Sequence, residues 1–279
     1  MADRAFGNLE AHFAGKPLLS PVPMMASAFD LRGKTALITG SGSGLGFAMA
    51  RGAGGGRRAA SSSTAATSPS SMPRRRRCAR SGLRSRPPPS TSPTRHRSTP
   101  ASATWSPGST RSTSWSNNAG VQHRGPIEEF SDADWRRLMA TNLDAPLLLA
   151  RAVIPAMKAR RAGKIINIGS LMSRLARPTT VPYQTSKGGI AMLTRGLAVE
   201  LAPFNIQVNA IAPGFFRTEM NAALTGNPEF SAWVEKRTPA GRWAAPQELA
   251  GAAVFLASPA SAFVTGQILY VDGGFTAGM

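Results

Sequence analysis

The sequence predicts an α/β fold with a doubly wound parallel sheet in a single domain. One apolar run, KTALIT at 34–39, leads into a glycine-rich turn and then into the helix-compatible FAMARG. A second apolar run, KIINIGS at 164–170, comes shortly before a helical pattern of apolar residues. Strand, turn and helix in this alternation are typical of parallel sheets. The chain of 279 residues, 42% of them hydrophobic, suffices for one sizeable domain.

The first apolar run ends in the turn GSGSGLG at 40–46. Glycines let a backbone approach a pyrophosphate closely, and the helix that follows offers free N–H groups and a favourable dipole. The turn therefore predicts a dinucleotide site. An ordinary glycine-rich turn would show the same pattern.

A polar pair, Tyr183 and Lys187, stands in a stretch whose apolar residues recur at helical spacing. Four residues apart on a helix, the two side chains lie on one face. A pair of this kind is common on helix surfaces. Here Ser170 closes the preceding strand, and the sequence NNAG at 117–120 and Asn142 come before it. This combination predicts a catalytic site.

Residues 51–116 differ from the rest of the chain. They hold thirteen Arg and seventeen Ser, no Asp, Glu or Lys, and no Val, Ile, Phe or Tyr, so they carry +13 of the net charge of +19. This composition predicts no buried strands. It fits a disordered basic linker, or an arginine-rich nucleic-acid arm of the kind that the arginines at 74–77 suggest.

A shifted reading frame also explains this composition, since GC-rich coding DNA read out of register yields Arg, Pro, Ser and Ala. We assume that each original codon consists of the third base of one printed residue's codon and the first two bases of the next residue's codon. Ala60 to Thr67 then permits VVLNGRD, a strand followed by a turn. In the same phase Arg111 to Ser116 permits IDILV, whose last Val is forced because Trp115 has a single codon. We therefore favour a frameshift that is compensated just before Asn117.

The motifs TGSGSGLG, NNAG, Asn142, Ser170, YQTSK and Pro213-Gly214 stand in the order of the short-chain dehydrogenase/reductase family, which the chain resembles over 30–50 and 117–279. The resemblance implies a Rossmann-like domain over 28–279, in which strands 2 to 4 are disrupted. Within the family, NNAGVQHRGPIEEF, TPAGRW and YVDGG look similar to bacterial gluconate 5-dehydrogenases. This implies an NAD(P)-dependent oxidoreductase that interconverts a secondary alcohol and a ketone on a sugar acid such as gluconate.

The resemblance implies four catalytic residues. Tyr183 would be the general acid/base, Lys187 its electrostatic partner and a ligand of the cofactor ribose, Ser170 the partner of the substrate oxygen, and Asn142 the anchor of a proton-relay water. A free tyrosine titrates near about 10, so a base at neutral pH needs its pKa lowered by roughly three units. We expect the Lys187 ammonium and the charge of the oxidised nicotinamide to supply that shift.

NAD or NADP is the implied cofactor. The glycine turn would face the pyrophosphate, the 117–120 loop the adenine-side ribose, and the segment 213–218 the nicotinamide. The residue that selects between NAD and NADP belongs at the end of the second strand, inside the anomalous segment, so the choice stays open. The implied cofactor-binding residues are Gly40, Ser41, Gly44, Leu45, Gly46, Asn117, Ala119, Gly120, Tyr183, Lys187, Pro213, Gly214 and Thr218.

A small sugar-acid substrate needs cationic partners for its carboxylate. His123, Arg124, Arg174 and Arg177 lie in loops after predicted strand ends, where such pockets form. Each of them is equally compatible with an ordinary solvated charge.

Several classes of protein are disfavoured. A single cysteine and three scattered histidines predict no internal disulfide and no metal site. No apolar stretch is long enough to span a membrane, and the N-terminus lacks the pattern of a secretory signal, so we expect a cytoplasmic protein without membrane partners. Residues 1–27 are expected to be a flexible N-terminal extension, explained either by a start codon chosen too far upstream or by a genuine arm.

Family members commonly form tetramers, so the resemblance implies a homotetramer through the helices around 135–158 and 183–201. Two other functions compete with the oxidoreductase. One is an inactive or nucleic-acid-binding derivative that uses the basic segment, and the other is a homologue that binds cofactor without turnover. We further expect the chain as printed to be poorly soluble or partly disordered over 51–116 and to bind no nicotinamide cofactor, because both neighbours of the strand at 34–39 lose their apolar side chains.

Overall fold

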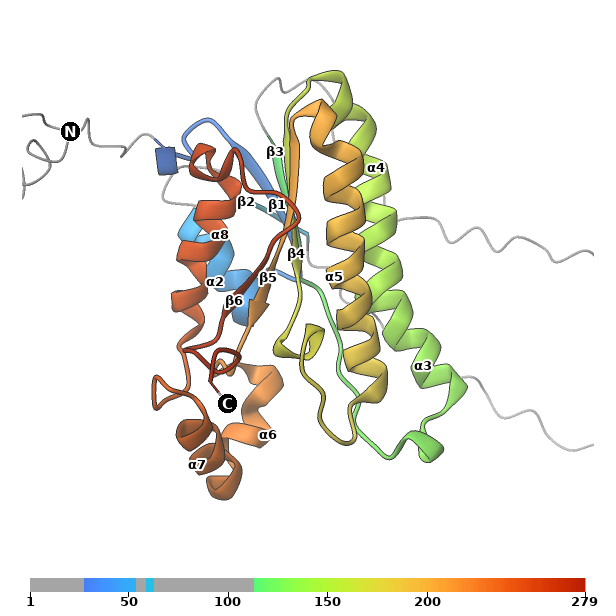
Figure 1. The fold of residues 1–279 in the computed structure, drawn as a ribbon, viewed down its shortest axis with the longest axis vertical. Coiled ribbons are helices and arrows are strands. Elements are labelled where there is room, and N and C mark those ends of the chain that lie inside the picture. Colours follow the sequence, from blue (N-terminus) through green and yellow to red (C-terminus); the bar gives the residue numbers. More distant parts are fainter. Residues whose placement is uncertain (1–27, 54–58, 63–112, 279) are drawn as a thin grey trace, which may run out of the picture. The chain divides into compact units, whose positions relative to one another are not determined.

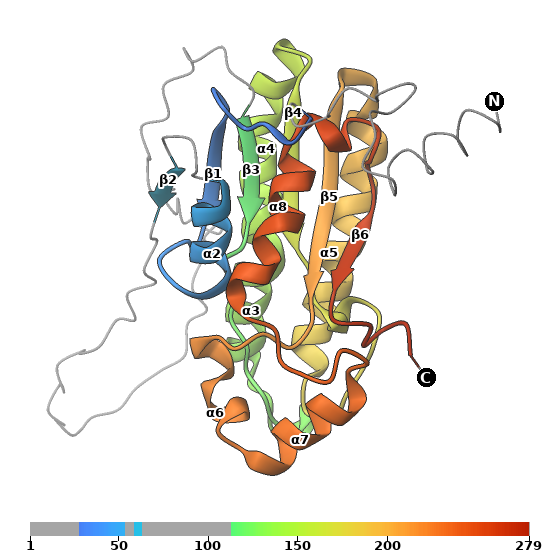
Figure 2. The ribbon, with the colours of Figure 1, turned by 90° about the vertical axis from the view of Figure 1, so that its left-hand side faces the viewer.

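A parallel sheet of six strands organises the protein (Figure 2). The structure is a computed structural model that describes residues 28–53, 59–62 and 113–278. Within these residues the strands lie in the order β2-β1-β3-β4-β5-β6. Their bounds are β1 Thr35–Thr39, β2 Ala59–Ser62, β3 Thr113–Asn117, β4 Gly163–Ile168, β5 Ile206–Pro213 and β6 Ile268–Val271.

Helices cover both faces of this sheet (Figure 1). On one face lie α2 (Gly44–Ala53) and α8 (Ala250–Ala257), and on the other lie α3 (Asp132–Met139), α4 (Ala145–Ala159) and α5 (Val181–Leu201). Two further helices, α6 (Ala222–Thr225) and α7 (Pro228–Arg237), lie beyond the carboxyl ends of the strands. Single turns of 3₁₀-helix span Ile127–Glu129, Leu171–Ser173, Ala202–Phe204, Glu219–Asn221, Pro246–Leu249 and Pro259–Ser261, and a π-helical turn spans Ala140–Asp144.

The apolar core is divided between the two faces of the sheet. On the α2 and α8 face, Met49, Ile166 and Phe216 belong to one buried cluster. On the α4 and α5 face, Met157 and Leu201 belong to another. A sheet covered on both faces needs near-continuous apolar strands, and β4 and β5 have them.

The predicted α/β class with a parallel sheet is confirmed. β1 lies between β2 and β3, which is the arrangement expected of the first strand in a doubly wound sheet. The apolar run at 34–39 forms β1, and the helix predicted over 183–201 runs from Val181 to Leu201. Residues 1–27 and most of the segment 51–116 lie outside the described residues, so the expectations for them stay predictions.

One expectation from composition is wrong for the end of this segment. β3 is an interior strand that pairs with β1 and β4, and its Ser114 and Ser116 are buried. β2 likewise pairs with β1 over four residues. A parallel ladder is made by backbone N–H and C=O groups, which serine and threonine carry as well as valine does. The unusual composition therefore does not prevent β3 from pairing. It changes how the side chains of β3 pack against the helices.

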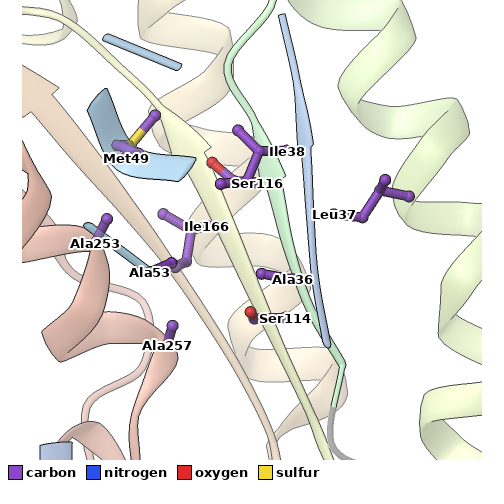
Figure 3. A pocket seen from close by; sticks show the side chains of 10 residues that line it. All are labelled: Ala36, Leu37, Ile38, Met49, Ala53, Ser114, Ser116, Ile166, Ala253 and Ala257. Carbon is purple, nitrogen blue, oxygen red and sulfur yellow. The ribbon is translucent and has the colours of Figure 1, made fainter. Parts of the chain in front are cut away.

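A small apolar cavity marks that change (Figure 3). It measures ≈ 20 Å³ and lies between the sheet, α2 and α8. Ser114 and Ser116 line it from β3, on the same face of the strand, and no described residue forms a hydrogen bond with the buried Oγ of Ser116. The remaining lining residues are Ala36, Leu37, Ile38, Met49, Ala53, Ile166, Ala253 and Ala257. Two small polar side chains thus face a space that aliphatic side chains would fill.

The frameshift hypothesis assigns aliphatic residues to these two positions. In the shifted reading the codon that ends in Ser114 encodes Phe, Leu, Ile or Val, and the codon that ends in Ser116 encodes Val. The hypothesis therefore predicts that Ser116→Val raises the free energy of unfolding by about 0.5–2 kcal/mol, because it fills part of the cavity and removes an unpaired buried hydroxyl. Denaturant unfolding followed by circular dichroism measures the change.

Two companion variants sharpen this test. Ser116→Ala is the matched control, since it removes the hydroxyl and leaves the cavity. Adding Ser114→Ile to Ser116→Val should stabilise the protein beyond Ser116→Val alone. If Ser116→Val is no more stable than Ser116→Ala, the cavity does not accept aliphatic groups and the frameshift hypothesis loses this support.

Candidate active site

The glycine turn after β1 is built for close backbone approach. Gly40 and Gly44 have φ values of +62° and +54°, which side-chain-bearing residues rarely adopt. A Cβ at Gly46 would lie 2.3 Å from the Gly40 carbonyl oxygen, so only glycine fits where α2 begins. Gly42 has open space around it. The turn therefore presents bare backbone at the N-terminus of α2, which suits an anion.

Hydrogen bonds tie this turn to the loop that follows β3. Thr39 Oγ1 accepts hydrogen bonds from the backbone N–H groups of Asn118 (3.0 Å) and Ala119 (3.1 Å). Asn118 Nδ2 donates to the Gly40 carbonyl at 3.0 Å. The sequence analysis does not predict Thr39 or Asn118 as site residues, although Asn118 belongs to the NNAG motif. These two residues meet only because β1 pairs with β3, and neither a threonine nor an asparagine in the sequence indicates that pairing.

The site fits the diphosphate of a dinucleotide at this end. Ser41 Oγ is buried and has no hydrogen-bond partner among the described residues, as expected of a group that meets a ligand. Thr218 comes from a distant segment to lie beside Gly44, since a Cβ on Gly44 would be 3.9 Å from the Thr218 methyl group. The structure thus brings Thr218 to the glycine turn that carries Ser41, and the predicted roles of these residues toward a cofactor stay predictions.

Two predicted cofactor residues point elsewhere. The side chain of Leu45 packs against the apolar core below the turn, which leaves its backbone as the part that can meet a ligand. Asn117 Nδ2 donates to Asn167 Oδ1 at 2.8 Å, inside the sheet. Asn167 in turn donates to Thr194 Oγ1 of α5. The side chain of Asn117 therefore links three elements of the fold, and the residue following it begins the loop that reaches the site.

Tyr183, Ser170 and Lys187 form the centre of the site. The side chain of Ser170 lies close enough to the Tyr183 hydroxyl to act on its pKa. Ser170 also caps the turn after β4, accepting from Met172 N at 3.2 Å. Lys187 Nζ lies 5.7 Å from the Tyr183 ring centroid and donates to the Ile168 carbonyl at 2.7 Å. The structure thus brings these three predicted residues together, and their predicted catalytic roles stay predictions.

The pKa of Tyr183 shifts in the direction opposite to the one expected. Burial raises it above the ordinary value near 10, while the nearby Ser170 side chain and the charge of Arg124 act to lower it. Burial also lowers the pKa of Lys187 to about 8. The expectation that Lys187 lowers the pKa of Tyr183 is not supported in the protein alone, because burial penalises the phenolate and the ammonium alike.

Asn142 anchors the loop that passes over Lys187. It lies in the π-helical turn between α3 and α4, where Ala145 N reaches back to the Ala140 carbonyl. Its Oδ1 accepts from Val121 N (2.9 Å), and its Nδ2 donates to the Val121 carbonyl (2.9 Å) and to Ser186 Oγ (3.2 Å). Its predicted role as the anchor of a relay water stays a prediction.

At the far end of β5, Gly214 packs directly on the segment after β6. Gly214 N donates to the Val271 carbonyl at 2.9 Å, and a Cβ there would lie 2.7 Å from the Asp272 Cα. Pro213 closes the strand beside it. This glycine is therefore required by the close approach of two chain segments, and it fixes the path of the chain toward Thr218.

The structure separates the four cationic substrate candidates. The positive charge of Arg124 acts on both Tyr183 and Arg177, so these two arginines share the neighbourhood of the tyrosine. His123 turns away, with Nδ1 3.4 Å from Asp134 Oδ1 and its ring against Phe130. Arg174 is exposed, as Arg124 is, but its charge acts on Tyr270 rather than on Tyr183. Arg124 and Arg177 are therefore the candidates that the geometry retains.

Comparison with known proteins identifies the family. A family model described as "Enoyl-(Acyl carrier protein) reductase" matches residues 114–276. The chain belongs to the short-chain dehydrogenase/reductase family. Members of this family are oxidoreductases, as the sequence predicted. The matched range begins inside β3, where the anomalous composition ends.

Curated relatives and solved structures resemble the chain over most of its length. The 5-keto-D-gluconate 5-reductase of Escherichia coli strain K12 is 44% identical over 250 residues, covering 90% of this chain and 98% of that protein. The gluconate 5-dehydrogenase of Gluconobacter oxydans is 52% identical over 160 residues, or 57% of this chain and 62% of that one. A gluconate 5-dehydrogenase from Burkholderia cenocepacia J2315, solved in complex with NADP and tartrate, matches with 36% identity and a TM-score of 0.71, covering 91% and 99% of the two chains.

No helix in the described part of the chain is long and apolar enough to cross a membrane. Among the same residues, no group of three or more His, Cys, Asp or Glu side chains is arranged to hold a metal ion.

The buried lysine predicts how stability depends on pH. Because folding lowers the pKa of Lys187 from 10.5 to about 8, the folded protein binds fewer protons than the unfolded chain between these values. The free energy of unfolding should therefore rise with pH in this window, by up to roughly 1.4 kcal/mol per pH unit from this group. Denaturant unfolding at pH 7.5, 8.5 and 9.5 measures the slope.

Lys187→Met provides the comparison, since it has similar volume and no titrating group. Its slope should be smaller than that of the unaltered protein. Lys164, whose pKa burial also lowers to about 8, contributes to both proteins equally, so the difference isolates Lys187. Identical slopes would show that Lys187 titrates at its ordinary pKa in the folded state.

Proposed function

We propose that this protein interconverts the secondary alcohol of a sugar acid of the gluconate type and the corresponding ketone, with NAD or NADP as cofactor. The observation that carries the proposal is the convergence of Tyr183, Ser170 and Lys187 beside a glycine turn on one side and the Arg124 and Arg177 pair on the other. The names of the relatives support it, since they act on gluconate or its 5-keto form.

The cofactor end of the site would hold the dinucleotide through backbone and hydroxyl groups. The glycine turn and Ser41 would face the diphosphate, the loop at 119–120 the adenine-side ribose, and the segment 213–218 the nicotinamide. A bound nicotinamide supplies the carbon that exchanges hydride with the substrate. The NADP held by the Burkholderia relative supports the class of cofactor.

Tyr183 would move the proton. Burial keeps its hydroxyl protonated at neutral pH, so the group is ready to donate to a ketone oxygen that is being reduced. Ser170, whose side chain acts on the same hydroxyl, would hold the substrate oxygen beside it. In the direction of oxidation the phenolate has to form, and Arg124 and the Lys187 ammonium would stabilise it.

The arginine pair would bind the carboxylate of the substrate. Burial and the charge of Arg124 both lower the pKa of Arg177, so each guanidinium stands near a like charge. Neither forms an ion pair with a described acidic residue. A carboxylate between two guanidinium groups would remove this repulsion and accept charge-assisted hydrogen bonds. The tartrate bound by the Burkholderia relative supports an acid ligand.

The proposed assembly is a homotetramer in the cytoplasm. α4 and α5 leave apolar side chains exposed on the outer layer of the domain, and Val199 is 79% exposed. Burying such a face between copies would remove apolar area from water. The apolar residues concerned are Leu147, Leu148, Met192 and Val199.

In a chain whose reading frame over 51–116 is restored, Tyr183→Phe should lower turnover of gluconate with NAD or NADP by several orders of magnitude and leave cofactor affinity nearly unchanged, because it removes only the proton-transfer group. Tyr270→Phe is the matched control, since Tyr270 is the other tyrosine of the chain. Absorbance of the reduced cofactor measures turnover, and quenching of tryptophan fluorescence measures cofactor binding.

Each outcome has a defined meaning. Retained turnover in Tyr183→Phe removes this residue from the mechanism. A screen in which simple secondary alcohols outperform every sugar acid overturns the choice of substrate and not the family. The cofactor titration of the unaltered chain also tests the expectation, drawn from the composition of 51–116, that it binds none.

A further inference from the structure

Arg177 has a main chain fixed to the helix that carries Tyr183. Its backbone N–H donates to Gln184 Oε1 at 3.2 Å, and its carbonyl accepts from Thr180 Oγ1 at 3.1 Å. Both partners belong to the start of α5 or to the residue before it. The position of the Arg177 backbone relative to Tyr183 is therefore set locally, and only its long side chain is left to be placed.

An aromatic ring of another element places that side chain. The Arg177 guanidinium carbon lies 5.0 Å from the centroid of the Phe230 ring, in the first turn of α7. A guanidinium at this distance over a ring is attracted by the negative face of the π-system. The contact joins the start of α5 to α7, which lies beyond the carboxyl ends of the strands (Figure 2).

The Phe230 ring is itself held in place. Its backbone N–H donates to Asn227 Oδ1 at 2.9 Å, which caps α7. Its ring centroid lies 5.9 Å from that of Phe215, 5.4 Å from that of Trp233 and 6.4 Å from that of Trp243. Tilted and edge-to-face contacts of this kind fix ring orientation. The aromatic neighbours therefore fix the Phe230 ring, and the fixed ring in turn holds the Arg177 guanidinium.

We propose that Phe230 is a positioning residue that holds the Arg177 guanidinium toward the substrate carboxylate, and so sets a preference for sugar acids over neutral polyols. This inference rests on the proposed function. Without the ring, Arg177 would be free to swing away from the like charge of Arg124 into solvent. When no substrate carboxylate is bound, Arg124 and Arg177 repel each other. The attraction between the Phe230 ring and the Arg177 guanidinium opposes this repulsion.

The test compares Phe230→Leu with Phe230→Tyr. Leucine keeps an apolar side chain in the cluster and loses the π-face, whereas tyrosine keeps both ring and cation–π contact. Phe230→Leu should raise KM for gluconate by about 3- to 30-fold with little change in kcat, and leave KM for a neutral hexitol unchanged. Phe230→Tyr should restore the affinity for gluconate.

Two further variants assign the effect to Arg177. In Phe230→Leu combined with Arg177→Gln, KM for gluconate should equal that of Arg177→Gln alone, because the ring acts only through the arginine. Arg237→Gln is the control for the cluster. Arg237 lies 4.7 Å from the ring of Phe275, whose centroid is 5.3 Å from that of Phe215, and donates to the Gly278 carbonyl. Its replacement should leave the ratio of KM values for acid and hexitol unchanged.

A binding measurement keeps this inference separate from the proposed function. Titration of the protein with gluconate, followed by tryptophan fluorescence, reports acid affinity without turnover, since Trp233 adjoins Phe230. If the unaltered protein oxidises no sugar acid, the proposed function fails, and a weaker acid affinity in Phe230→Leu still supports the positioning role. Equal losses for gluconate and hexitol, or no loss in Phe230→Leu, would overturn it.

Discussion

The pairing of β1 with β3 is the contact on which both halves of the site depend. It places the glycine turn after β1 against the loop after β3, and Thr39 Oγ1 and Asn118 then bond the two together. The same loop continues to Gly120, where a Cβ would lie 3.5 Å from Asn142 Oδ1 and 3.9 Å from Lys187 Nζ. One strand pair therefore connects the candidate dinucleotide cradle to the catalytic group. That pair includes β3, whose ladder is made by the backbone and whose Ser114 and Ser116 line the cavity beside α2 and α8.

Local patterns in the sequence predicted those parts of the site whose geometry is local. Tyr183 and Lys187 share a helix face because of their spacing, and the positive φ values of Gly40 and Gly44 follow from a turn that only glycine tolerates. The parallel sheet of the α/β fold followed from the alternation of strand and helix. In the first two cases the interacting groups are only a few residues apart in the sequence. The sheet follows from a general rule about how strands and helices alternate in α/β proteins.

The parts that sequence did not predict depend on partners from remote segments. Asn117 bonds to Asn167, fifty positions away, and so enters the sheet. His123 and Arg124 are neighbours in the chain, yet one faces Asp134 and the other acts on Tyr183. The sign of the Tyr183 pKa shift was also missed, because burial depends on the whole fold and spacing reports only the nearby charge. Phe230 carries no chemical signal in the sequence, and only its contact with Arg177 draws attention to it.

The electrostatics of the site explain why it would favour anionic ligands. Lys187 is buried without a carboxylate, Arg124 acts on Arg177, and burial opposes the negative form of Tyr183. The first two arrangements cost folding free energy, since a buried or crowded cation loses hydration that no described acid replaces. The diphosphate of a dinucleotide at the glycine turn and a carboxylate between the arginines would supply the missing negative charge. A site that is strained by its own positive charge gains most from ligands that carry the opposite charge, so the cost in stability and the preference for acids have the same physical origin.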